Sequence, residues 1–440
     1  MTAYHYIPAD LFADLASGLG GPAAIRQLVG AQHSKHLLLL RFITDAYSGN
    51  QDGDTAVDIL VEAERRDPRA VAALITDPMV GAWAARTTRR LLGYIDKRST
   101  APVAADLAQY GALAAAAAVR AGLDAELRTQ ALGGSVTLPT LGGAALGADG
   151  PAVVTVSAGR ATVTGRSARV AVHALDAGWW ETRHLFAGHG GLVGSVAIED
   201  GNPYRDCYHA PAADRLPAIE VQQWQDLFSE AWGLLVQYVP ARAAELANGL
   251  RSVVPLVTGD DGMARSGTAR DAFGTLGLTR PRSAAELAVT LVHEFQHSKL
   301  SVLLDLVPLY TPGGDERHFA PWRADARPTG GLIQGVYAFL GVADTWRALR
   351  SAPGLEELAT REFAFAREQV AVGIAGLEAS VELKPSGREF AGGLRKAVER
   401  LRTEQVTESA SNVAAETLRK RRDIWRLDHP EIAMVGEAPR

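Results

Sequence analysis

A short segment of the sequence brings together three side chains that can bind a metal ion or act beside one. Residues 287–306 read LAVTLVHEFQHSKLSVLLDL, in which His293 and His297 bracket Glu294 as HEFQH. Residues four apart lie on one side of an α-helix, so both imidazoles can point at one cation. Glu294 lies beside them and can contact a metal-bound water or orient a ligand. The spacing therefore predicts a metal site on a helix.

The position of that helix is predicted independently of any metal. Ser283 and Glu286 form an S-x-x-E capping box, which is typical of a helix start. Both histidines then fall in the middle of an apolar segment, where buried imidazoles need polar partners, and a metal ion is one such partner. The alternative interpretation is a helix with two ordinary, partly exposed histidines.

Two histidines make an incomplete site, and the residues downstream decide between two kinds of chemistry. Zinc peptidases often take a further Glu or His as the third ligand, and they use one metal-activated water and a base. The longer peptidase signature H-E-x-x-H-x-x-G-x-x-H fails here, because SKLSV follows His297. An iron oxygenase that uses a 2-oxo acid needs two histidines and usually one carboxylate, with open positions left on the metal.

The segment 310–339, YTPGGDERHFAPWRADARPTGGLIQGVYAF, has the charges that an oxygenase requires. Asp325 could complete the metal site. A 2-oxo acid also needs a cation for its far carboxylate, and the planar guanidinium of Arg323 or Arg327 binds a carboxylate in bidentate fashion. In the alternative interpretation, the segment is a solvated loop with incidental charges.

The elements that must position these residues are mostly helices. Apolar spacing predicts an N-terminal helical region over 1–131, a β-rich section over 132–215 and a helical catalytic region with the HExxH helix over 216–440. SAGR at 157–160 is typical of a hairpin tip, and a helix break is expected before Pro240. We therefore predict a mainly α fold (α+β), with a β-rich insert and the metal-binding helix at the centre. A cupin-type barrel is not expected, because it carries its metal ligands on strands.

The composition narrows the classes of function. The chain has 440 residues, 47% hydrophobic residues, 22% charged residues and a formal net charge of −5, so no clearly basic domain indicates nucleic-acid binding. The only cysteine, Cys207, cannot form an intramolecular disulfide, which favours a reducing compartment. The Ala-rich run at 112–119 is far shorter than the roughly 20 apolar residues of a membrane span. The first twelve residues lack a signal-peptide pattern. We expect a cytoplasmic protein with no nucleic-acid or membrane partner.

Several longer segments resemble one family, the HExxH motif-containing peptide-modification proteins. The most specific are VHEFQHSKLSVLLDLVPLY and APWRADARPTGGLIQGVYAF, and the others are AQHSKHLLLLRF, IEDGNPYRDCY and DAFGTLGLTRP. The resemblance covers most of the chain. It implies an iron(II)- and 2-oxoglutarate-dependent hydroxylase that places a hydroxyl on the β-carbon of a residue in a ribosomally made precursor peptide. It also implies a pathway that contains a radical-SAM maturase.

Carried onto this sequence, the resemblance implies that His293 and His297 bind iron and that Glu294 tunes or orients the site. Asp325 is the first choice for the third ligand on charge grounds, and Gln334, Asp315 and His318 are alternatives. Two other functions remain open. One is a zinc metallopeptidase with Glu294 as its base, and the other is a non-catalytic carrier that presents the precursor peptide to a maturase.

Overall fold

The computed structural model describes residues 5–47, 49–96, 101–173, 178–206, 208, 210–259, 261–430 and 432. Cys207 and the first four residues lie outside this part of the chain. The structure therefore does not bear on the reducing compartment expected from Cys207 or on the signal-peptide pattern at the N-terminus. Within it the fold is mainly α, as expected, with 13 helices and about 16% strand. No helix in these ranges is both long enough and apolar enough to cross a membrane.

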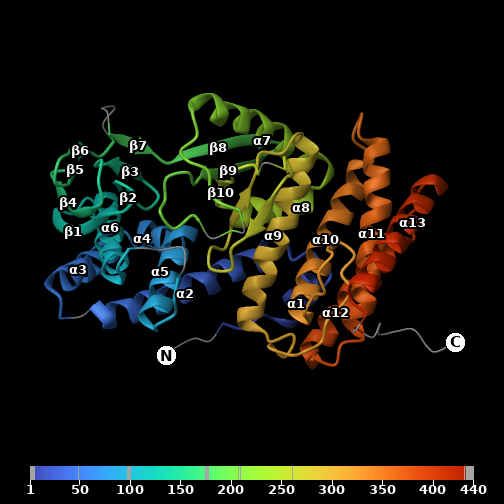
Figure 1. The fold of residues 1–440 in the computed structure, drawn as a ribbon. Helices are drawn as coiled ribbons and strands as arrows, with labels where there is room; N and C mark the ends of the chain where they lie inside the picture. Colours follow the sequence, from blue (N-terminus) through green and yellow to red (C-terminus); the bar gives the residue numbers. More distant parts are fainter. Residues whose placement is uncertain are drawn as a thin grey trace.

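The N-terminal region is helical, and its long second helix, α2, connects the layer formed by the later helices to the rest of the molecule (Figure 1). Its helices are α1 (Ala9–Ala16), α2 (Gly21–Tyr47), α3 (Gln51–Arg66), α4 (Pro68–Ile75), α5 (Pro78–Leu91) and α6 (Val103–Ala121). Asp67 and Asp77 cap α4 and α5, and a proline follows each cap at the first turn, where no backbone N–H is needed.

The β-rich section begins earlier than the sequence pattern predicted. The helical expectation for the segment that ends at residue 131 is correct up to Ala121 and wrong beyond it. Gly122 has a φ of 64° and ends α6 in the left-handed conformation, and β1 follows with alternating burial. Two small sheets, β1-β4-β5-β6 and β2-β3-β7, contain β1 (Ala125–Ala131), β2 (Ser135–Leu138), β3 (Gly142–Ala145), β4 (Gly150–Ser157), β5 (Arg160–Thr164), β6 (Arg169–Ala171) and β7 (Trp179–Glu181). The hairpin tip expected at 157–160 is confirmed, because it joins β4 to β5.

A third sheet joins the β-rich section to the helical region that follows. Its order is β11-β12-β10-β9-β8, made of β8 (Arg183–His189), β9 (Leu192–Ile198), β10 (Ser252–Pro255), β11 (Ser266–Thr268) and β12 (Thr275–Leu278). β10 is parallel to both β9 and β12, whereas β8 and β11 are antiparallel edge strands. The helical prediction for the residues of β10 is wrong. All four residues of β10 are buried, and a short apolar run of this kind does not distinguish a buried strand from a helix segment.

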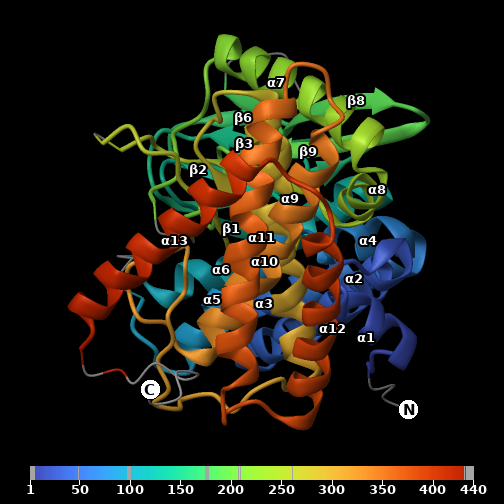
Figure 2. The same ribbon diagram turned by 90° about the vertical axis from the view of Figure 1, so that its right-hand side faces the viewer.

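The remaining helices form a bundle on the other side of this sheet. They are α7 (Ala218–Tyr238), α8 (Pro240–Gly249), α9 (Ala284–Leu306), α10 (Thr329–Leu349), α11 (Glu356–Glu378), α12 (Pro385–Arg402) and α13 (Glu408–Asp428). The predicted break before Pro240 is confirmed. In Figure 2, α10, α11 and α12 lie side by side and α13 runs along their outer side. The HExxH helix, α9, packs against α10 and α7 and also against β11, so it lies between the bundle and the sheet.

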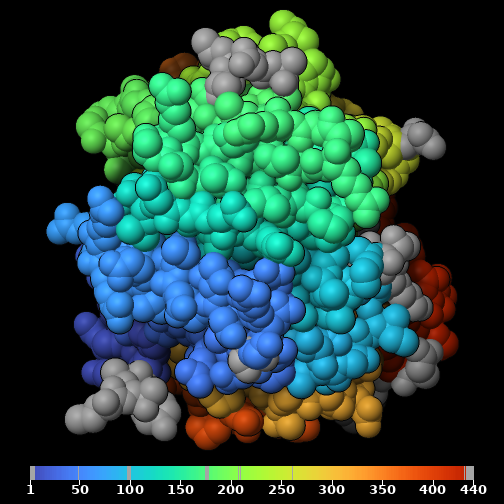
Figure 3. Space-filling view, turned by 90° about the vertical axis from the view of Figure 1, so that its left-hand side faces the viewer, coloured from blue at the N-terminus to red at the C-terminus, as the bar shows by residue number. Residues whose placement is uncertain are grey.

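Two hydrophobic cores hold these layers together. One contains α1, the first half of α2, part of the five-stranded sheet and the helices from α7 to α12. The other contains the rest of α2, the helices from α3 to α6 and the small sheets. Figure 3 shows that the N-terminal helices and the β-rich section together form one continuous face. Because α2 has buried residues in both cores, it ties the two parts together.

Candidate metal centre

The HExxH segment occupies the middle of α9, as the sequence predicted. Ser283 caps the helix by accepting a hydrogen bond from the Glu286 N–H at 3.2 Å. The rings of His293 and His297 lie with their centroids 4.8 Å apart and nearly perpendicular to each other. The two imidazoles are therefore neighbours on one side of α9, which we call the histidine side.

His297 is oriented by a residue of α10. Its Nδ1 lies 3.0 Å from Oε1 of Gln334, which can only accept a hydrogen bond, so Nδ1 carries the proton. In the neutral imidazole the lone pair is then on Nε2, where a metal can bind. Ligating histidines are typically held in this way by a hydrogen bond from the other ring nitrogen. Gln334, one of the alternative third ligands, thus contacts a predicted metal ligand directly.

His293 is neutral at physiological pH. Burial, and to a smaller extent the neighbouring His297, lower its pKa to about 4 against the opposing effect of Glu294. Its ring is nearly perpendicular to that of Phe339, with the centroids 5.1 Å apart, and Phe339 in turn stacks on Trp322 with the ring centroids 4.9 Å apart. A neutral imidazole with 21% of its side chain exposed is suited to bind a metal from solution.

Glu294 points toward β11 and is almost fully buried, with 2% of its surface exposed. The hydroxyl of Ser266 donates to its Oε1 at 2.7 Å, and the hydroxyl of Thr268 lies 2.7 Å from its Oε2. Oε1 is also 3.8 Å from Nε2 of His293. The carboxylate is therefore held beside the histidine pair by two hydroxyls.

Ser266 and Thr268 were not identified from the sequence. They are 28 and 26 residues from Glu294, in a segment whose first part reads as a loop. Sequence spacing carries no signal for such a contact, because it exists only once β11 packs on α9.

The second group of predicted site residues lies together in the segment between α9 and α10. Asp325 accepts from Arg323 at 2.6 Å and from Arg327 at 3.0 Å, and its side chain is half exposed. Trp322, which precedes Arg323, connects this group to the histidine side through Phe339. The structure thus groups the two arginines with the aspartate, as the sequence pattern suggested.

The remaining alternative ligands are placed differently. His318 is buried, with its Nε2 3.0 Å from the Thr329 hydroxyl and 3.7 Å from Glu316. Asp315 is exposed in the same segment. Among the residues that the structure describes, no group of three or more His, Cys, Asp or Glu side chains could hold a metal ion. The third ligand, with Asp325 as first choice, stays a prediction.

A buried ion pair lies away from the histidine side of α9. Lys299 is fully buried and donates to Oε2 of Glu245 on α8 at 2.8 Å. Oε1 of Glu245 accepts the backbone N–H groups of Gly20 and Gly21. Burial lowers the pKa of Lys299 to about 8, while Lys299 and Arg242 hold the pKa of Glu245 below its usual value against the effect of burial. The pair thus ties α9 to α8 and to the start of α2.

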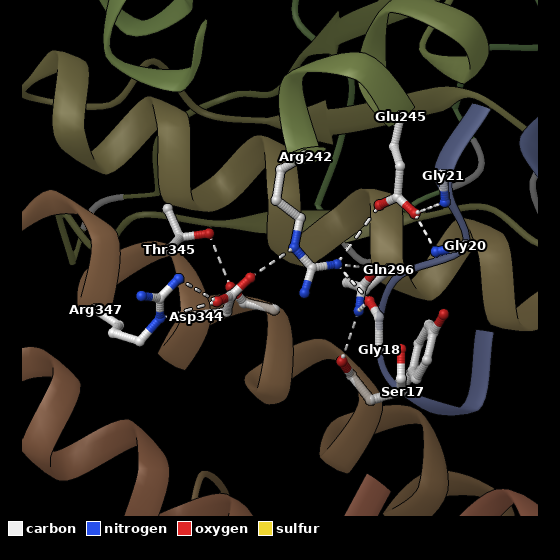
Figure 4. Close-up of polar contacts among 12 residues, drawn as sticks. Ser17, Gly18, Gly20, Gly21, Arg242, Glu245, Gln296, Asp344, Thr345 and Arg347 are labelled. Carbon is white, nitrogen blue, oxygen red and sulfur yellow. Dashed lines mark hydrogen bonds and ion pairs between the residues drawn. The ribbon is translucent and has the colours of Figure 1, made fainter. Parts of the chain in front are cut away.

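Arg242 extends this network to α10, as Figure 4 shows. Its guanidinium donates to the Gly18 carbonyl, to Oε1 of Gln296 at 3.2 Å and to Asp344 at 3.3 Å. The Gln296 amide also donates to the carbonyls of Gly18 and Tyr337. Contacts from α8, α10 and the turn before α2 therefore fix the position of α9 and, with it, of the histidines.

Comparison with known proteins adds no assignment. No family model matches the sequence, and no curated protein matches it either. The function is therefore argued from the residues of this site and their geometry.

Proposed function

We propose that this protein is an iron(II)- and 2-oxoglutarate-dependent hydroxylase that acts on the β-carbon of a residue in a ribosomally made precursor peptide. The observation that carries the metal-dependent part is the pair of adjacent imidazoles, one of them oriented by Gln334. Two imidazole nitrogen donors with a nearby carboxylate suit iron(II) and leave positions open for a co-substrate. The choice of a peptide substrate rests on the family resemblance described above.

In this proposal His293 and His297 hold the metal, and Gln334 keeps His297 in the tautomer that binds. Asp325 remains the first choice for the third ligand. Arg323 and Arg327 share this one carboxylate, so the trio has an excess of one positive charge that favours a dicarboxylate such as 2-oxoglutarate. Bound iron would let O₂ oxidise the peptide and 2-oxoglutarate together. One oxygen atom would enter the peptide C–H bond, and the other would enter the succinate that forms from 2-oxoglutarate with loss of CO₂.

The walls of the site have a separate task. Phe339 and Trp322 give the histidine side an apolar surface, which limits the access of water to the reacting groups. Glu294 is held by Ser266 and Thr268, so its negative charge stays fixed beside His293. We assign it the task of orienting and electrostatically tuning the site.

A zinc metallopeptidase is the second candidate, because one observation favours it. Oε1 of Glu294 lies 3.8 Å from Nε2 of His293, which is close enough for that carboxylate to reach a water bound to the same metal. Such an enzyme would release peptide fragments, whereas the hydroxylase would add one oxygen to an intact peptide.

The deciding experiment is anaerobic addition of Fe(II) and 2-oxoglutarate to the purified protein. We expect a weak visible charge-transfer band that fades when O₂ is admitted. His297→Gln should abolish the band, whereas His189→Gln, which changes an exposed histidine at the end of β8, should retain it. Tight binding of one zinc ion with no such band would overturn the hydroxylase proposal and favour the peptidase.

The cellular setting follows from the same proposal. We propose a precursor peptide as the partner, a radical-SAM maturase in the same pathway and the cytoplasm as the compartment. Co-purification of an intact peptide that gains one oxygen mass on incubation with Fe(II), 2-oxoglutarate and O₂ would test the first of these.

A further inference from the structure

The contacts around α9 show what the histidine side faces. Successive residues of a helix are rotated by about 100°, so the neighbours of α9 can be followed around its axis. Glu294 faces β11, Ser298 accepts the N–H of the residue before β12, Lys299 faces α8 and Gln296 faces α10. His293 lies between the Gln296 and Glu294 directions. The histidine side therefore faces the space between α10 and β11.

β11 offers an open sheet edge toward this space. It is the outermost strand of the five-stranded sheet and, among the described residues, pairs only with β12. Thr279 donates its N–H to the Arg265 carbonyl, so Arg265 is hydrogen-bonded to β12. In an antiparallel pair every second residue is bonded in this way, so Gly267 also bonds β12. The N–H and C=O groups of Ser266 and Thr268 therefore point away from β12, toward the open edge. Within the described residues these outward groups have no hydrogen-bond partner, which leaves two donors and two acceptors for another strand.

A cavity of about 420 Å³ begins where β11 ends. Its lining includes Thr268 and Arg270, and α5 contributes Arg86, Arg89 and Arg90. Three aspartates also line it, and two of the four arginines, Arg90 and Arg270, pair with Asp106 and Asp305 outside the lining. We call this cavity the arginine pocket.

Two exposed arginines of this pocket, Arg89 and Arg270, keep N–H groups for a ligand. Arg89 bonds Asp271 at 2.6 Å through one nitrogen, and Arg270 bonds Asp305 at 2.6 Å through one nitrogen. A guanidinium has five N–H donors, so each ion pair leaves several unused. Arg89 and Arg270 are 51% and 67% exposed, so these donors can reach a carboxylate from solution.

We propose that an extended acidic peptide binds as an additional strand on the free edge of β11, passes the histidine side, and places a carboxylate in the arginine pocket. Strand addition of this kind uses main-chain hydrogen bonds for affinity and side-chain pockets for specificity. Thr268 belongs to both the edge and the pocket lining, so the carboxylate belongs to a residue within one or two positions of the one opposite Thr268. That this peptide is the substrate rests on the proposed function, whereas its binding does not require metal.

The first test uses fluorescein-labelled peptides of alternating threonine and valine that end in two glutamates, with binding followed by fluorescence anisotropy in EDTA. We expect replacement of both glutamates by glutamine to weaken binding about tenfold. N-methylation at successive positions should weaken binding about fivefold at every second residue and leave the residues between unaffected. A peptide with a C-terminal amide, compared with one with a free carboxylate, shows whether the side chain or the terminus occupies the pocket.

Variants of the protein test the same binding mode by changing the proposed peptide site. Arg89→Gln and Arg270→Gln should each weaken binding of the glutamate peptide and leave binding of the glutamine peptide unchanged. Arg395→Gln, which removes an exposed and ion-paired arginine of α12, is the matched control. Ser266→Pro removes one outward N–H without breaking a bond to β12, and Ser266→Ala removes the hydroxyl while retaining that N–H.

The outcomes separate this inference from the proposed function. Binding that ignores both N-methylation and the glutamates, or no binding of any probe at millimolar concentration, would overturn strand addition at β11. The charge-transfer band does not depend on the peptide, so the metal proposal would stand or fail separately. Periodic sensitivity to N-methylation together with glutamate dependence would establish the binding mode even if no hydroxylation follows.

Discussion

Gln334 is the residue that orients His297 of the histidine pair. Its Oε1 accepts from Nδ1 of His297, which fixes the tautomer that exposes Nε2. Orienting partners of this kind affect metal affinity by about 10- to 100-fold when removed.

We therefore predict that Gln334→Leu weakens Fe(II) or Zn(II) binding by about tenfold or more, because the tautomer of His297 is then no longer selected. Gln334→Glu should restore most of the affinity, because a carboxylate is also an acceptor. Competition with a metal-sensitive dye measures both variants. Equal loss in the two variants would contradict an orienting function.

Thr268 holds Glu294 in place through its side-chain hydroxyl. Its hydroxyl lies 2.7 Å from Oε2 of the buried carboxylate and 2.8 Å from the Glu294 carbonyl oxygen. Because a buried acceptor that loses its donor costs about 1–3 kcal/mol, we predict that Thr268→Val lowers the free energy of unfolding by about 1–2 kcal/mol. Urea denaturation measures this change. Thr268→Ser retains the hydroxyl and should lose less, and an unchanged Thr268→Val variant would show that the hydrogen bond has no net effect.

At the scale of elements, α9 depends on a charged network as well as on apolar packing. Lys299 is fully buried, and its main partner is Glu245, which also binds the backbone before and at the start of α2. Breaking a buried pair on one side leaves the other charge uncompensated.

We predict that Lys299→Met lowers the free energy of unfolding by about 3 kcal/mol, because Glu245 then keeps its buried charge and has the more distant Arg242 as its remaining cationic partner. The double variant with Glu245→Gln should recover part of that loss, because the buried charge is gone. Urea denaturation of the three proteins measures the coupling. Additive losses would contradict a direct pair.

Across the whole molecule, two carboxylates lie where the N-terminal helices meet the five-stranded sheet. Asp77 caps α5, Glu199 follows β9, and both line a cavity of about 610 Å³. Burial, and then the charges of Asp77 and Asp200, raise the pKa of Glu199 to about 8, and burial raises the pKa of Asp77 to about 6.

This arrangement predicts how stability depends on pH. The pKa of Glu199 is about 4.5 in the unfolded chain and higher in the folded one, so the folded state binds more protons between these values. The stability that Glu199 contributes is therefore fully present below about pH 4.5 and is lost as the pH rises toward 8. Glu199→Gln should raise the melting temperature at pH 8. It should also reduce the change in the free energy of unfolding between pH 5 and 8 by an amount on the order of a few kcal/mol. Thermal unfolding from pH 5 to 8 measures the effect, and an equally steep decline in the variant would assign it to other groups.

Local patterns in the sequence determined the elements that are most independent of their surroundings. The S-x-x-E cap and the apolar spacing of α9 predicted its start and the joint orientation of His293 and His297, because helix geometry alone makes residues four apart neighbours. The hairpin at 157–160 and the break before Pro240 follow from similarly local chemistry. Only the tertiary structure decided the short buried strand β10, the contact of Ser266 and Thr268 with Glu294, and the position of Gln334 at His297. These contacts join residues that are far apart along the chain, and hydrogen bonds between distant residues arise from packing, which leaves no periodicity to read.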